Sequence, residues 1–88
     1  MSKDVKRDLD KACRIKRSLI EHNENNCREA GKEYLVSVRY ATFICLRYGE
    51  NSNAYKKSLE VTKRKLANYM RALAKLYDAQ NLDVKDYM

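Results

Sequence analysis

The chain has 88 residues, of which 35% are charged, and its 19 basic and 12 acidic side chains give a net charge of +7. This length predicts one domain, residues 1–88. The chain has no Pro and only two Gly, Gly31 and Gly49, which argues against a turn-rich β architecture and predicts an all-α protein. A positive charge attracts phosphate backbones, anionic lipids and acidic proteins alike, and it is also usual on a solvated surface, so it leaves the partner open.

The first predicted helix runs from Ser2 to about Glu21. One side of it is apolar and consists of Val5, Leu9, Ala12, Cys13, Leu19 and Ile20. The polar segment 22–26 predicts a break, because the short side chains of Asn compete for backbone hydrogen bonds. Asn26 and Glu29 then have the spacing of a capping box. Neither Pro nor Gly forces this break, so one continuous helix remains the alternative.

The second predicted helix, at about 26–48, contains the least polar part of the chain. In the run Tyr34–Tyr48 only Arg39 and Arg47 are charged, and the apolar side chains fall on every side of the helix axis. Such a helix must be covered on more than one side. Gly49 follows the run and is a natural helix terminator, because glycine adopts the left-handed conformation without a steric penalty.

The third predicted helix, at about 53–80, can be capped by Ser52 or Asn53 and precedes a short polar tail at 81–88. Its apolar seam alternates spacings of four and three residues and consists of Tyr55, Leu59, Thr62, Leu66, Tyr69, Leu73 and Leu76. The second helix repeats this alternation at Tyr34, Val38, Ala41, Cys45 and Tyr48. Such seams pack helices at a shallow angle.

Together these elements predict a small three-helix bundle. The short link 49–53 would fold the second and third helices into an antiparallel hairpin, and the first helix would pack across it. A domain of about this size buries only roughly 60% of its unfolded surface. A homodimer would add to that burial, so self-association belongs to the prediction.

The cysteines and the apolar segments indicate the cellular compartment of the protein. Cys13, Cys27 and Cys45 form an odd set without paired spacing, and no N-terminal segment resembles a signal peptide. These features predict a reduced, cytoplasmic protein. The run Tyr34–Tyr48 is shorter than the roughly 20 residues that cross a bilayer, and it contains two Arg. No metal-ligand spacing and no Gly-rich phosphate loop occurs, so neither a metal nor a cofactor is predicted.

A basic ridge on the third helix is the candidate nucleic-acid site. It consists of Lys57, Arg64, Arg71 and Lys75, opposite the leucine seam. A ridge of this kind can follow phosphates, although it can equally be the solvated side of a soluble helix. Glu60 lies at its edge and can pair with Arg64 four residues on, which would weaken the site.

A second candidate surface lies on the second helix, away from its packing seam. It consists of Arg39, Tyr40, Phe43 and Arg47. Arg and aromatic side chains are typical of protein-interface hot spots and also stack on bases. This surface can serve a second copy or a foreign protein. In the remaining alternative the first helix covers Val36 and Phe43, and the Arg side chains reach solvent at the margins.

The segment Arg17-Ser18-Leu19-Ile20-Glu21-His22 resembles the element of the HEPN ribonucleases in which an Arg precedes a His by a few residues. The resemblance implies a dimeric helical ribonuclease with Arg17 and His22 at its site. The preferred prediction is instead a non-enzymatic module that binds nucleic acid or a nucleoprotein. The alternative is a small adaptor or inhibitor that docks on an acidic protein partner, and the ribonuclease is the third possibility.

Overall fold

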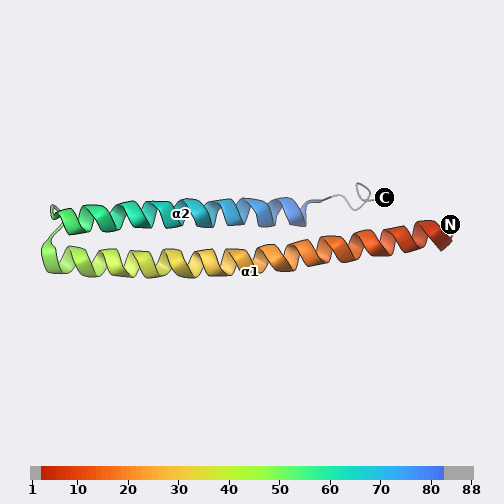
Figure 1. Ribbon diagram of the computed structural model, residues 1–88, viewed down its shortest axis with the longest axis horizontal. Helices are drawn as coiled ribbons and strands as arrows, with labels where there is room; N and C mark the ends of the chain where they lie inside the picture. Colours follow the sequence, from red (N-terminus) through yellow and green to blue (C-terminus); the bar gives the residue numbers. More distant parts are fainter. Residues whose placement is uncertain (1–2, 83–88) are drawn as a thin grey trace.

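The computed structural model describes the backbone of residues 3–82 and the side chains of residues 5–82. It contains two helices, α1 (Lys3–Tyr48) and α2 (Asn53–Gln80), which lie side by side and antiparallel (Figure 1). The Cα trace measures 69 × 15 × 11 Å. The predicted three-helix bundle is therefore wrong, because the chain forms an extended helical hairpin. Two predicted features, Ser2 and the part of the tail at 83–88, lie outside the described residues.

The predicted break at 22–26 does not exist, and α1 is helical throughout this segment. The Asn side chains form hydrogen bonds that leave the helical backbone intact. Asn23 Nδ2 donates to the Leu19 carbonyl at 2.8 Å, and Asn26 Nδ2 lies 3.2 Å from His22 Nε2, each one turn back. Asn25 Oδ1 accepts from Arg28 Nη1 at 3.4 Å. The continuous helix, which the sequence had left as the alternative, is therefore the correct one.

In the link between the helices, Gly49 ends α1 and Ser52 caps α2, as predicted. Gly49 has a φ of 90° and its N–H donates to the Cys45 carbonyl at 2.8 Å, which ends α1 at Tyr48. Ser52 caps α2, since its Oγ accepts from the Tyr55 N–H at 3.1 Å and donates to the Gly49 carbonyl at 2.8 Å. The end of α1 and both ends of α2 coincide with the predicted positions.

Most of the buried residues between α1 and α2 are small. Ser37 and Ala41 on α1, and Ser58 and Ala79 on α2, are all buried. Thr62 Oγ1 donates across the interface to the Ser37 carbonyl at 3.3 Å. Small side chains let two helix backbones approach closely, and each buried hydroxyl is satisfied by a backbone carbonyl.

The predicted seam of α2 holds in part, since Thr62 and Tyr69 contact α1. Leu66 and Leu73 are 37% and 41% exposed, whereas Ser58, which neighbours Leu59, is 6% exposed. Leu66 and Leu73 thus lie at the margin of the interface, whereas Leu59 and Leu76 are half-buried. On α1 the predicted seam holds at Ala41, but Tyr48 is 58% exposed.

Gly31 marks a point of especially close approach. A methyl group at its Cα would lie 3.3 Å from the Tyr69 ring of α2. That ring also stacks on Tyr34, with 6.3 Å between the ring centroids and 19° between the planes. Gly31 thus makes room for the aromatic pair that holds the middle of the hairpin together.

The two helices differ in length, so α1 runs on past the end of α2 (Figure 1). Leu19 and Asn23 of α1 border the same hollow as Ala79 and Leu82 near the end of α2. The hairpin contact therefore involves mainly the half of α1 that follows Leu19. Neither helix contains an apolar stretch of the length and hydropathy that a bilayer crossing requires.

Candidate nucleic-acid interface and an uncovered helix face

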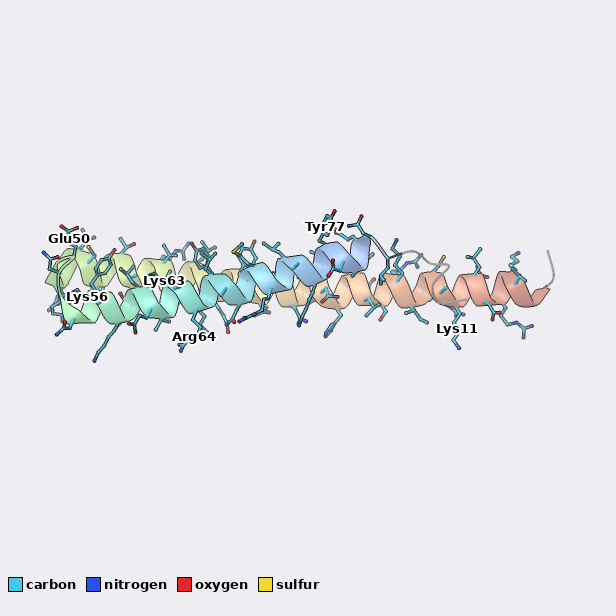
Figure 2. The ribbon with its side chains drawn as sticks, turned by 90° about the horizontal axis from the view of Figure 1, so that it is seen from above. Lys11, Glu50, Lys56, Lys63, Arg64 and Tyr77 are labelled. Atoms are coloured by element: carbon cyan, nitrogen blue, oxygen red, sulfur yellow. The ribbon has the colours of Figure 1, made fainter. Side chains whose placement is uncertain are left out.

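The outer side of α2 is a line of cationic side chains. Residues 53–80 contain seven basic and two acidic residues. Lys57, Arg64 and Arg71 are seven residues apart, which places them on one line with about 10 Å between neighbours along the axis. All three are exposed, as is Lys75. Basic side chains project from α2 into solvent along much of its length (Figure 2).

These cations are not neutralised within the hairpin. Among residues 5–82, the ion pairs are Lys65 with Glu33, at 3.4 Å, and Lys32 with Glu29, at 3.6 Å. The pairing of Glu60 with Arg64 that the sequence allowed is absent from them. Arg71 Nη2 donates a hydrogen bond to Asn68 Oδ1, which orients the guanidinium and leaves its charge uncompensated. The ridge therefore presents bare positive charge.

The largest net positive charge lies in the half of the hairpin that contains the link. Residues 34–75 carry nine basic and two acidic side chains, whereas the rest of the chain carries ten of each. Residues 34–75 thus carry a net +7, and the remainder sums to zero because +4 over residues 1–20 is offset by −2 over 21–33 and −2 over 76–88. A cluster of one sign raises the local concentration of anionic partners more strongly than the same charges spread evenly.

The second predicted surface lies on the side of α1 that α2 does not cover. Tyr40 is 59% exposed and Phe43 is 55% exposed, and the Arg39 and Arg47 side chains are also exposed. The alternative in which the first helix covers Val36 and Phe43 is wrong. Residues 3–21 belong to the same continuous helix and cannot fold back over it.

Glu29 and Glu33, which sequence reasoning missed, extend this surface together with Val36, and Arg39 lies beside the line that they form. Glu29, Glu33, Val36, Tyr40, Phe43 and Arg47 follow one another at spacings of four and three residues. They therefore form one continuous stripe along α1, which we call the outer stripe. Its middle is apolar, one end is acidic and the other is basic. The same alternation that predicted the hairpin seam could have identified it.

Arg17 and His22, which carry the resemblance to the HEPN ribonucleases, are both exposed on α1. They are five residues apart, which at 100° per residue puts them about 140° apart around the helix. His22 Nε2 faces Asn26 Nδ2. A single chain therefore does not bring these two side chains to one point.

No three His, Cys, Asp or Glu side chains within residues 5–82 lie close enough together to hold a metal ion. The cysteines are all unpaired: Cys13 is exposed, Cys27 is buried and Cys45 is half-buried. No protein family, no curated protein and no solved structure matches this chain. The arguments about its function therefore start from the two surfaces of the hairpin.

Proposed function

We propose that this protein is a non-enzymatic module that binds the phosphate backbone of nucleic acid through the outer ridge of α2. The observation that supports the proposal is the line of exposed, unneutralised cations Lys57, Arg64, Arg71 and Lys75. Its span, from 57 to 75, is about 27 Å along the helix. Contacts of this kind position a protein on a nucleic acid without reading its sequence.

The proposal predicts a specific salt dependence. Each phosphate contact releases counterions, so log K falls against log salt with a slope of about −0.9 per contact on duplex DNA. We expect Arg64→Ala and Arg71→Ala each to weaken binding to a random-sequence duplex and to flatten this slope by roughly one contact. Fluorescence anisotropy titrations at several salt concentrations measure both quantities, and an RNA duplex and a single strand show which form is preferred.

Lys11→Ala is the matched control, because it removes the same unit of charge from the N-terminal end of α1, far from the ridge (Figure 2). If Lys11→Ala weakened binding as much as Arg64→Ala, general charge would explain the effect and the ridge would lose its role. Absence of binding to all three nucleic acids at low salt would remove the proposed function altogether.

A second candidate function is protein docking through the outer stripe of α1. Val36, Tyr40 and Phe43 expose 63%, 59% and 55% of their surface on one side of a helix. Soluble proteins keep contiguous apolar surface of this kind mainly where something binds. In this alternative the protein is a small adaptor or inhibitor, and Phe43 is an anchor of the interface.

We place the protein in a reducing compartment. Cys13, Cys27 and Cys45 all lie on α1, about 21 Å and 27 Å apart along the axis. A disulfide requires Cα atoms within about 7 Å of each other. None of these cysteines can therefore bond to another within one chain, which is typical of proteins that keep their thiols reduced.

A further inference from the structure

The outer stripe is built to be complementary to itself in one orientation only. Read from its N-terminal end, it has Glu29 and Glu33, then Val36, Tyr40 and Phe43, then Arg47. The acidic and basic ends flank an apolar middle that is more than half exposed. A two-fold symmetric interface requires a surface that matches its own copy when reversed. The stripe has this property when two α1 helices run antiparallel.

We propose that a second copy of this chain docks on the outer stripe, so that two hairpins form an antiparallel dimer centred near Tyr40. In that register Glu33 lies opposite Arg47 of the second copy, and Arg47 lies opposite Glu33. Val36 and Phe43 of each copy pack against Phe43 and Val36 of the other. The spacings of four and three residues keep all these contacts on one seam.

The parallel arrangement fails on the same residues. It would put Arg47 beside Arg47 and Glu33 beside Glu33, and like charges across an interface cost several kcal/mol of binding free energy. The charges thus select the antiparallel dimer.

α2 supports this surface without blocking it. Val61 and Lys65 of α2 lie beside Glu33, Val36 and Tyr40 of the stripe and line a groove with them, in which Lys65 pairs with Glu33. The groove can widen the contact on either side of the two-fold axis. Arg64 projects from the side of α2 away from α1 (Figure 2), whereas Lys57 of the ridge borders Tyr40 of the stripe.

The overlap of the two copies is limited in length. With Tyr40 at the centre, Gly49 at the end of one α1 lies near residue 31 of the other, so about 17 residues of each helix overlap, or roughly 25 Å. An interface of this size lies toward the small end of specific interfaces. We expect a reversible dimer with a dissociation constant in the micromolar range. The N-terminal halves of the two α1 helices then point in opposite directions.

This inference deepens the second candidate function and needs no nucleic acid. Analytical ultracentrifugation of the full chain at about 0.15 M salt, where the Debye length is about 8 Å, measures the monomer–dimer equilibrium. We expect Glu33→Arg and Arg47→Glu each to weaken the dimer by at least about tenfold. The double variant carrying both changes restores the opposite charges, and we expect it to return to within about threefold of the parent.

Lys65→Gln is the control, since Glu33 also pairs with Lys65 within one chain. Because Lys65 also lines the groove beside the stripe, the conservative change is used, and we expect Lys65→Gln, which breaks the pair without adding a like charge, to leave the dimer intact. A parent chain that stays monomeric up to submillimolar concentration overturns the proposal. So does a double variant that fails to recover. Either result leaves nucleic-acid binding by the α2 ridge unaffected, because that binding is measured separately.

Discussion

Phe43 and Ile44 are adjacent on α1 and have opposite environments. Ile44 is 7% exposed and faces α2, whereas Phe43 is 55% exposed and faces away from it. The helix turns by 100° between them, so one residue contributes to the hairpin core and the next to the outer stripe. Single substitutions at these two positions can therefore measure the contribution to folding and the contribution to docking separately.

We expect Ile44→Ala to lower the free energy of unfolding by about 2–5 kcal/mol, because it leaves a cavity between the helices. Phe43→Ala should change it by less than about 1 kcal/mol in dilute monomer, while it weakens docking on the outer stripe. Urea titrations followed by circular dichroism measure the first effect. A large loss of stability in Phe43→Ala would show that Phe43 belongs to the core.

At the scale of the helices, local chemistry predicted the boundaries well. Gly49 and Ser52 determine the turn through interactions within four residues, so their roles follow from the sequence alone. The basic ridge could also be located, since spacings of seven residues fix one side of α2. The break at 22–26 was predicted wrongly because an Asn side chain can bond to a backbone carbonyl one turn earlier as readily as it can end a helix, and the sequence does not say which.

The packing of the two helices could not be predicted in the same way. Counting apolar residues favours Leu66 and Leu73 for the interface, whereas close approach of the backbones favours Ser58 and Ala79. That choice depends on contacts between residues distant in sequence. The sequence prediction of the outer stripe was incomplete for a related reason. Glu29 and Glu33 look like ordinary solvated charges in the sequence, and only the exposure of the apolar residues between them and Arg47 links them to one surface.

Proline at position 25 tests the continuity of α1. Asn25 lies in the middle of the helix and is exposed. We expect Asn25→Pro to remove a backbone hydrogen bond, kink α1 and cost about 3 kcal/mol. Asn25→Ala, as the control, should stay within about 0.5 kcal/mol of the parent. Thermal melts and helical content by circular dichroism provide the measurement, and full tolerance of proline would indicate a loop at this point.

On the scale of the whole molecule, the hairpin is long and its core is thin. No large side chain among residues 5–82 is completely buried, and the core consists mainly of Ala, Ser, Cys and Ile. Two helices can enclose only a thin apolar seam, so much apolar surface stays exposed on both sides. The two proposed surfaces meet near the link, where Lys57 of the ridge and Tyr40 of the outer stripe line one groove, and Arg64 and Arg71 lie farther along α2.

The shape itself is directly measurable. The Cα atoms have a radius of gyration of 20.2 Å, whereas a compact globular domain of this length has about 12 Å. We expect small-angle X-ray scattering from dilute monomer to give a value near the larger figure and a distance distribution typical of a rod. At higher concentration the antiparallel dimer should raise the value further, since its two copies overlap only near the link and extend in opposite directions. A monomer close to the compact value would contradict the extended hairpin, and with it the exposure of Val36, Tyr40 and Phe43 on which the dimer depends.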